Sequence, residues 1–420
     1  MLVTFIILGK SKSYPKKLIT IMHFRFINIL AKIAPAFVLG LLSFHARAEE
    51  TPKELLLNDS IAKASLQYTF MLDDLHGTKL LPRTYVSNKR IMVKENDWTS
   101  GFFPGSLWLL YELTKQENFK INAQYYTHLL DKEQFDHGTH DIGFMLYCSD
   151  GNALRLTHDS QYKKVLLNAA ESLSTRFNPK VSGIKSWDAK PWTYPIIIDN
   201  MMNLELLMWA SQVDREKDFK SIAVAHADLT LRNHFRSDSS TYHVVDYDPV
   251  SGLVLQKKTH QGAADESSWS RGQSWAIYGY TMMYRETGNP KYLKQAQKTA
   301  LLFINYPTMP EDGIPYWDYN APQIPNELRD AAAAAIMCSA LFELCDYSSG
   351  AEKQTFLNFA WKQLTSLTSK NYLATQGTNG GFLLMHATGH HPKNSELDVP
   401  INYADYYYLE SIIRAKKHLQ

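Results

Sequence analysis

The sequence predicts an all-α protein built from repeated helical hairpins. Beyond residue 48, amphipathic or apolar helical stretches alternate with polar loops, and the strict alternation typical of strands is scarce. Four helical stretches begin alike after a polar turn, with an aromatic residue followed four positions later by a small or apolar one. Residues at this spacing share one face of a helix, so each pair opens an amphipathic helix. The pairs are Phe119 and Ala123, Tyr162 and Leu166, Phe219 and Ala223, and Tyr292 and Ala296.

A longer similarity between two segments indicates the length of one repeat. Residues 98–101 (WTSG) resemble residues 269–272 (WSRG), and a Gly-x-x-Trp-x-x-Tyr pattern occurs beside each of them. A hairpin of about 50–60 residues would fit about six times, either closed into a double ring or stacked as an open solenoid. We expect the closed (α/α)6 toroid, because the apolar stretches 204–210 and 331–344 suit inner helices. Without a Pro/Gly/Ser-rich linker, residues 49–420 are expected to form a single domain.

The first 48 residues predict a secretory signal peptide. They carry seven Lys or Arg and no Asp or Glu, and an apolar run over 27–44 ends in the A-x-A motif at 46–48. Met22 precedes the basic start of this pattern, so we expect it to be the true start and residues 1–21 to be an upstream extension. A membrane anchor is the alternative, but Lys32 and Pro35 interrupt the run. We therefore expect a periplasmic or secreted protein with no stable membrane insertion after removal of the signal.

Charge and cysteine content exclude several classes of partner. Removal of residues 1–48 leaves 37 of the 44 basic residues against 42 acidic ones, and no basic block indicates binding to nucleic acid. The three cysteines, Cys148, Cys338 and Cys345, follow no metal-binding spacing. No nucleotide-binding glycine motif occurs, so the sequence predicts neither a metal nor a cofactor. The sequence leaves the oligomeric state open.

Two aspartates are candidates for acid–base chemistry. Asp141 begins an apolar stretch after a polar loop, and Asp199 ends the apolar run 196–198. Each could simply cap a helix, because Asp is a favoured N-cap residue. They lie 58 residues apart, about one hairpin, which would place them side by side at one end of the ring. Apolar surroundings raise a carboxyl pKa, and carboxylates in different environments are the common arrangement in glycan cleavage.

The segment 259–275 is dense in polar and aromatic residues. Arg271 could bind a substrate carboxylate bidentately, or it could pair with a structural acid. Trp269 and Trp275 could stack on a sugar or pack in the core. His243 and His260 follow no metal-ligand spacing, so a structural or hydrogen-bonding role is expected for both.

The chain resembles the unsaturated glucuronyl hydrolases of glycoside hydrolase family 88 over nearly its whole length from about residue 60. The matching segments occur in the family's order. They are DWTSGFFPGSLW (97–108), HDIGF (140–144), IIIDNMMNLELLMWA (196–210), YHVVDYDP (242–249), THQG (259–262), SSWSRGQSWAIYGY (267–280) and ADYYYLE (404–410).

This resemblance implies an (α/α)6 catalytic domain that removes a 4,5-unsaturated uronic acid from the non-reducing end of lyase-generated oligosaccharides. The parent glycan would be chondroitin, hyaluronan or heparin/heparan. By resemblance, Asp199 protonates C4 of the double bond and assists water addition at C5, and Asp141 positions the sugar. No cofactor is implied. The implied substrate-contacting residues are Trp98, His140, Trp187, His243, Gln261, Trp269, Arg271 and Trp275, to which we add His260 from the same dense segment.

Three other functions remain open on the sequence. An unsaturated rhamnogalacturonyl hydrolase would use similar chemistry on pectin fragments, although residues 140–144 and 267–280 favour the glucuronyl family. A polysaccharide lyase would create the unsaturated chromophore instead of consuming it. A glycan-binding protein would bind without turnover. The segment 386–400 lies where the family varies its aglycone and sulfate contacts, and it matches no subgroup.

We predict that the mature protein begins near Glu49 and is found outside the cytoplasm. N-terminal sequencing of the protein from separated cell fractions measures this directly. An intact Met1 or Met22 on cytosolic protein would contradict the predicted signal peptide.

Overall fold

The computed structural model describes residues 50–419, and the chain from residue 52 onward forms one compact unit. The predicted signal peptide and the predicted start at Met22 lie outside the described residues. Within the described part, no helix is long and apolar enough to cross a membrane.

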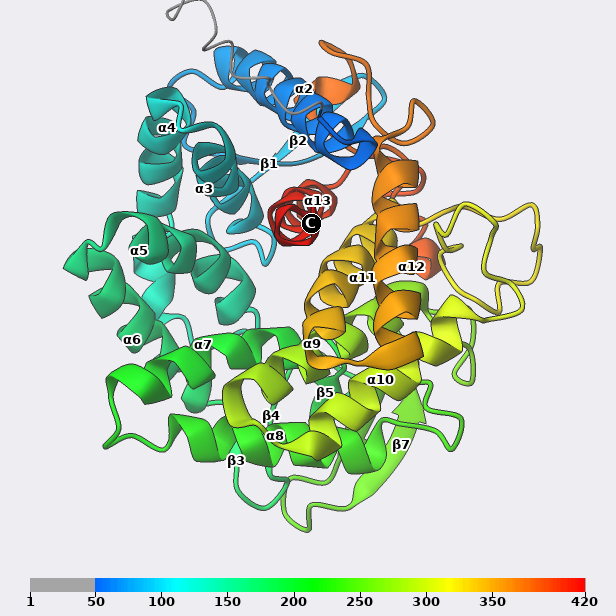
Figure 1. The fold of residues 1–420 in the computed structure, drawn as a ribbon. Coiled ribbons are helices and arrows are strands. Elements are labelled where there is room, and N and C mark those ends of the chain that lie inside the picture. Colours follow the sequence, from blue (N-terminus) through cyan, green and yellow to red (C-terminus); the bar gives the residue numbers. More distant parts are fainter. Residues whose placement is uncertain (1–49, 420) are drawn as a thin grey trace, which may run out of the picture. The chain divides into compact units, whose positions relative to one another are not determined.

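Six helical segments form a closed inner ring. In chain order they are α3 (Phe102–Thr114), the π-helical segment η2 (Gly143–Gly151), α7 (Asn200–Val213), α9 (Ser270–Thr287), α11 (Ala331–Leu344) and α13 (Asn402–Ala415). Each packs against the next, and α13 packs back against α3 (Figure 1). The ring closes because the last inner helix meets the first, which confirms the predicted toroid over the open solenoid.

A second set of helices covers this ring from outside. It comprises α2 (Pro52–Asp74), α4 (Glu117–His128), α6 (Ser160–Ser174), α8 (Phe219–Asn233), α10 (Pro290–Ile304) and α12 (Gly350–Thr368), with the short α5 (Asn152–Thr157) between η2 and α6. Outer helices α6 and α10 are amphipathic, and side chains cap both of them. The Asp159 side chain accepts a hydrogen bond from the Gln161 N–H at the start of α6. At the start of α10 the Asn289 side chain accepts one from the Lys291 N–H, and Pro290 occupies the first helical position.

Burial explains which helices lie inside. Every residue of α11 is buried, as the apolar stretch 331–344 predicted, and most of α7 is buried too. Close approach of these helices needs small residues. A Cβ atom on Gly279 of α9 would lie 2.5 Å from the Cβ atom of Met201 in α7. The inner helices therefore pack in a manner that leaves no room for a larger side chain at this position.

The second inner segment departs from the expected α-helix. Residues Gly143–Gly151 form a π-helix, and the N–H of Phe144 donates to the side-chain oxygen of Asn203 in α7 at 2.8 Å. Such wide turns are frequent at functional sites, and Asp141 lies directly before this one. Hydrophobic periodicity does not distinguish a π-helix from an α-helix over nine residues.

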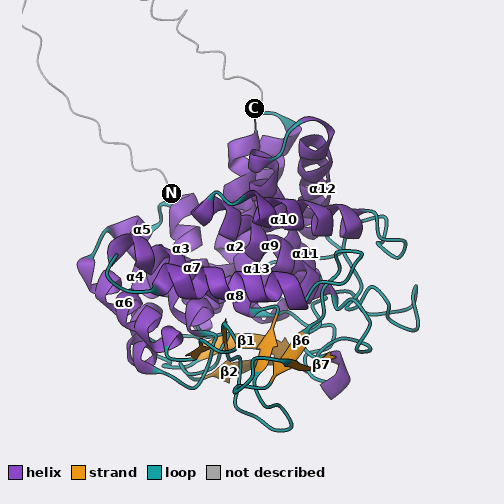
Figure 2. Ribbon diagram, turned by 90° about the horizontal axis from the view of Figure 1, so that it is seen from below, coloured by secondary structure: helices purple, strands orange, loops and turns teal. Residues whose placement is uncertain are grey.

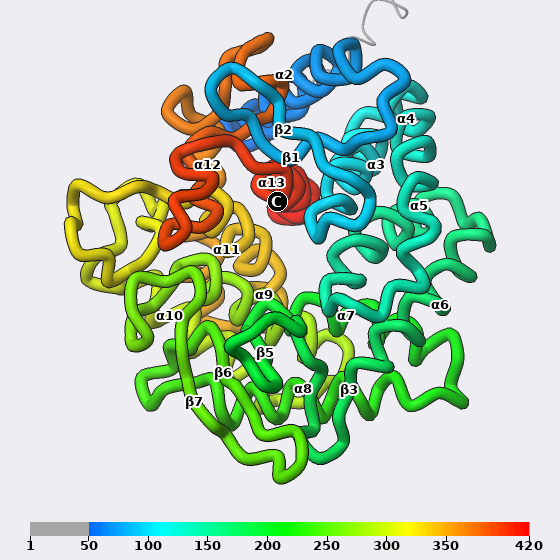
Figure 3. Tube along the Cα trace, turned by 180° about the vertical axis from the view of Figure 1, so that it is seen from behind, coloured from blue at the N-terminus to red at the C-terminus, as the bar shows by residue number. Residues whose placement is uncertain are grey.

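Short strands gather at one end of the helices (Figure 2). The strands β5 (Pro195–Ile197), β6 (Val244–Tyr247) and β7 (Val254–Lys258) form one antiparallel sheet, and β1 (Leu81–Val86) pairs with β2 (Lys89–Val93). A third small sheet joins β3 (Phe177–Asn178) to β4 (Gly183–Ile184). These sheets belong to the loops that lead into the inner helices, seen from behind in Figure 3. Asp141 and Asp199 stand at the starts of two such segments.

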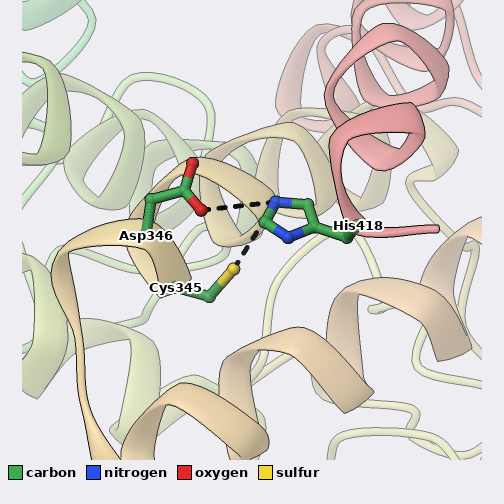
Figure 4. A group of neighbouring side chains, drawn as sticks. All are labelled: Cys345, Asp346 and His418. Atoms are coloured by element: carbon green, nitrogen blue, oxygen red, sulfur yellow. Dashed lines mark hydrogen bonds and ion pairs between the residues drawn. The ribbon is translucent and has the colours of Figure 1, made fainter. Parts of the chain in front are cut away.

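The C-terminal end of the chain is fastened beside the end of α11. The Nε2 atom of His418 lies 3.1 Å from the Phe342 carbonyl oxygen, 3.5 Å from Asp346 Oδ1 and 3.8 Å from Cys345 Sγ (Figure 4). Because Nε2 donates its hydrogen to a carbonyl, it has no lone pair to offer a cation. Burial also raises the pKa of the Cys345 thiol to about 11. This group of side chains anchors the chain end and does not suit a metal ion.

Candidate active site

A cavity of about 270 Å³ opens at the strand-bearing end, where the predicted residues converge. Eight of the eleven predicted site residues line it: Trp98, His140, Asp141, Trp187, Asp199, His260, Gln261 and Arg271. The other three lie behind its wall. His243, Trp269 and Trp275 are buried, with His243 stacked on Trp269 at 4.5 Å between ring centroids and Trp275 packed against Phe144 at 5.2 Å. The contacts of Trp269 support a packing role, whereas the buried Trp275 indole also faces Asp199 and lowers the pKa of that carboxyl.

A larger cavity of about 560 Å³ contains none of the predicted site residues. Its carboxylates are held by arginines. Arg414 lies 3.6 Å from Glu410, and Arg285 pairs with Glu205. Burial raises the pKa of Glu205, Arg285 opposes that rise, and none of the residues that the sequence predicts to act lies in this cavity. The smaller cavity is therefore the better candidate for acid–base chemistry.

Strand pairing brings Asp199 to the cavity. Residues 195–197 form β5, which pairs with β6, and the Ile198 N–H donates to the His243 carbonyl oxygen at 3.0 Å. The chain then turns directly into α7 at Asp199. The Asp199 carboxylate makes no capping hydrogen bond, and its Oδ2 atom is buried without a partner. The alternative of a helix-capping side chain at this position is therefore wrong.

Asp141 is likewise not a helix cap. Its backbone N–H and its Oδ2 atom both contact the hydroxyl of Thr139, at 3.1 and 3.2 Å. By contrast, Asp330 does cap its helix, since its carboxylate accepts the Ala332 N–H at the start of α11. The two candidate carboxylates thus differ from an ordinary cap, because they face the cavity and not the first turn of a helix.

Burial raises the pKa of both carboxyls. The pKa of Asp199 rises to about 7 because the side chain is desolvated, although Arg271 opposes the rise and Asp141 adds to it. The pKa of Asp141 also rises to about 7, again through desolvation. Groups with such pKa values exchange protons near neutral pH, as general acids and bases require.

His140 presents a lone pair to Asp141. Its Nδ1 atom lies 2.7 Å from the Ser186 carbonyl oxygen, to which it must donate, and its Nε2 atom lies 3.2 Å from Asp141 Oδ1. Burial lowers the pKa of His140 to about 3, so the ring is neutral and Nε2 carries no hydrogen. A protonated Asp141 can donate to this nitrogen, which favours the neutral form of the carboxyl.

Arg271 has a buried acid as its main partner. Its Nη1 atom donates to Asp330 Oδ2 and to the Thr388 carbonyl, both at 2.6 Å, and Nη2 donates to the Gly389 carbonyl at 2.6 Å. The guanidinium also lies over the Trp269 ring, 4.6 Å from its centroid. Because Arg271 still lines the cavity, it both holds the segment 388–389 and places positive charge beside the carboxylates.

Several residues of the cavity wall were missed by sequence reasoning. They come mainly from the segment 386–400 and are Gly389, His390, Lys393, Ser395 and Glu396, together with Arg83, Ile197 and Tyr403. Arg83 bonds to Glu396 at 2.6 and 3.0 Å and to Asp97 at 2.8 and 3.1 Å. Gln261 donates to the Gly389 carbonyl at 2.9 Å. No sequence motif joins Arg83 to an acid 313 residues away, and the segment 386–400 matches no subgroup of the family by sequence.

We predict that Arg271→Lys lowers the melting temperature of the protein. One ammonium group cannot hydrogen-bond to Asp330 and to two carbonyls at once. Removal of one partner of a buried ion pair lowers the free energy of unfolding by about 3–5 kcal/mol. Lysine keeps the positive charge, so we expect a smaller loss of stability than this. Calorimetry and steady-state kinetics on one preparation separate stability from binding. If Arg271 also binds a substrate carboxylate, affinity should fall about 10- to 150-fold. Unchanged KM and kcat/KM in folded protein would exclude that clamp.

The family model described as Glycosyl Hydrolase Family 88 matches residues 79–407. An unsaturated glucuronyl hydrolase of Formosa agariphila is 46% identical over 387 residues, which cover 90% of this chain and 96% of that protein. An unsaturated chondroitin disaccharide hydrolase of Streptococcus pneumoniae is 30% identical over 370 residues, covering 86% and 92%. A crystal structure of an unsaturated glucuronyl hydrolase specific for heparin has a TM-score of 0.84 and 44% identity, covering 86% and 98%. The chain thus belongs to Glycosyl Hydrolase Family 88.

Proposed function

We propose that the protein is an unsaturated glucuronyl hydrolase that acts on glycosaminoglycan fragments. It removes the 4,5-unsaturated uronic acid from the non-reducing end of oligosaccharides left by polysaccharide lyases. The observation that carries this proposal is the pair Asp141 and Asp199 in a family 88 chain. Both carboxylates line one cavity, and neither caps a helix. The relatives described as acting on heparin and chondroitin fragments support this substrate class over pectin fragments.

The chemistry follows from a carboxyl whose proton is exchangeable near pH 7. Protonated Asp199 gives its proton to C4 of the enol ether, and a water oxygen bonds to C5 while its proton returns to the Asp199 carboxylate. The resulting hemiketal opens and the glycosidic bond breaks, which releases the remaining saccharide. Burial of Asp199 supplies the raised pKa that this cycle requires. Asp141, kept neutral beside His140, would position the sugar without adding negative charge.

The cavity wall suits an anionic sugar. Arg271 and Lys393 line it, and Trp98 and Trp187 provide half-buried indole rings. Trp98 stands against Tyr403 at 5.3 Å between centroids, and Trp187 against His260 at 5.5 Å. A planar unsaturated ring can lie against an indole while a cation faces its carboxylate.

Export completes the proposal. The basic and apolar N-terminal segment with its A-x-A motif supports delivery to the periplasm or the exterior. Residues 49–420 would then be the mature catalytic domain.

Ultraviolet absorbance tests the function directly. The unsaturated uronate absorbs and its hydrated product does not, so we expect absorbance to fall on a panel of sulfated and unsulfated disaccharides from chondroitin, hyaluronan and heparin. A rise on intact polysaccharide would instead identify a lyase. A fall confined to unsaturated rhamnogalacturonan fragments would assign the pectin-directed activity, and binding without any change would indicate a glycan-binding protein.

We predict that Asp199→Asn lowers kcat about 100- to 10,000-fold, because the amide keeps the shape of the side chain but cannot transfer the proton. Substrate affinity measured by calorimetry should remain close to that of the wild type. The matched control is Asp159→Asn, an exposed cap on α6 away from the cavity, which should keep its rate. A variant at position 199 that retains more than about a tenth of the wild-type rate would remove this residue from the acid role.

A further inference from the structure

The ring of His243 is locked in one tautomer by the main chain. Its Nδ1 atom accepts hydrogen bonds from the backbone N–H groups of both His260 and Gln261, each at 3.2 Å. A ring nitrogen that accepts two hydrogen bonds carries a lone pair, so the hydrogen of the neutral ring must be on Nε2. The orientation of this donor is therefore determined by the loop that follows β7.

That donor faces Asp199 and has no other partner. His243 Nε2 lies 3.8 Å from Asp199 Oδ2, and within residues 50–419 both atoms are buried without a hydrogen bond. As whole residues His243 is 4% exposed and Asp199 8%, and solvent does not reach either of the two atoms. Buried polar atoms without partners are exceptions in native proteins, and here a donor and an acceptor of this kind stand face to face.

We propose that His243 is a positioning residue whose Nε2–H stabilises the ionised form of Asp199 after this carboxyl has given up its proton. The inference rests on the proposed role of Asp199 as the acid. A small rotation of the Asp199 side chain closes the gap to an ordinary N–H to oxygen distance of about 2.9 Å. The donor is thus not engaged while the carboxyl is protonated and becomes engaged when charge appears on it.

A neutral donor suits this task better than a charged one. Arg271 and the Trp275 indole on α9 favour the ionised form of Asp199, and Asp141 before η2 opposes it whenever Asp141 is itself ionised. A further cation at hydrogen-bond distance would hold Asp199 ionised at neutral pH and leave it no proton to give. A neutral imidazole N–H stabilises the carboxylate without forcing the proton off.

The surroundings of His243 keep it neutral. Burial lowers its pKa well below the usual value, and four cationic or titratable groups push in the same direction: His260, Arg271, His390 and His234. The ring cannot turn easily, because it stacks on Trp269 with an interplanar angle of 27° and its Nδ1 atom accepts two backbone N–H groups. The donor is therefore rigid, and Asp199 is the partner that moves.

Two substitutions at position 243 distinguish the role of Nδ1 from the role of Nε2. An asparagine oxygen can take the place of Nδ1 and keep the hydrogen bonds to His260 and Gln261, but it offers no donor at the position of Nε2. A glutamine nitrogen reaches the position of Nε2 and keeps the donor. In His243→Asn we expect the pKa of Asp199 to rise by about one unit, and in His243→Gln we expect it to stay near the wild-type value.

NMR titration of ¹³C-labelled aspartate carboxyls measures this pKa in the resting enzyme, with Asp199→Asn identifying the resonance. Turnover gives an independent reading. A reaction that needs protonated Asp199 slows as pH rises through its pKa, so in His243→Asn the alkaline limb of kcat/KM should move upward by the same amount. The structural control is His234→Asn, which removes a buried histidine whose Nε2 atom contacts the Ile196 carbonyl. This substitution should lower stability without changing the pKa of Asp199 or the alkaline limb of kcat/KM.

Equal shifts of the Asp199 pKa in the asparagine and glutamine variants, or no shift in either, would overturn the proposal. If His243→Asn does not fold, neutron diffraction of the wild type decides the matter, since deuterium on Nδ1 of His243 is incompatible with the proposed donor. Absence of turnover on every unsaturated substrate would instead refute the proposed function, while the carboxyl titration would still report whether His243 stabilises ionised Asp199.

Discussion

The burial of a carboxyl that caps no helix is the constraint on which the site depends. Asp199 stands at the first turn of α7, where an aspartate ordinarily accepts backbone N–H bonds and keeps a low pKa. Here the side chain faces the cavity, and burial raises its pKa to about 7. The orientation follows from β5, whose pairing with β6 determines how the chain enters the helix. The same junction therefore serves as a structural turn and as a source of protons.

Closure of the ring supplies the burial. The inner segments pack in sequence and α13 meets α3, so the loops before them converge at one end. The segment 386–400 then covers the cavity through bonds to Arg271, Gln261 and Arg83. An arginine with a buried acid partner thus shapes the cavity wall and contributes positive charge to it, and removal of Arg271 would disturb both.

Two histidines distinguish the two aspartates by their tautomers. His140 donates through Nδ1 to a carbonyl and leaves Nε2 as an acceptor beside Asp141. His243 accepts two backbone N–H groups at Nδ1 and leaves Nε2 as a donor beside Asp199. Main-chain hydrogen bonds set both tautomers, so one neutral imidazole favours a protonated carboxyl and the other an ionised one. Carboxyls with similar pKa values can thereby take different parts in one reaction.

Much of the fold and the candidate pair were predictable from the sequence. Helical periodicity is local, so the hairpins, the buried stretch 331–344 and the positions of Asp141 and Asp199 before inner segments could be read directly. The motifs around these aspartates also indicated the family whose model matches residues 79–407. What the tertiary structure alone decided is which atoms meet. The bonds from Arg83 to Glu396 and from Arg271 to Asp330, and the tautomer of His243, depend on partners brought together only when the ring closes. Hydrophobic patterning specifies which face of a helix is buried, but the choice of a hydrogen-bond partner is a matter of distance and direction, and these exist only in the folded chain.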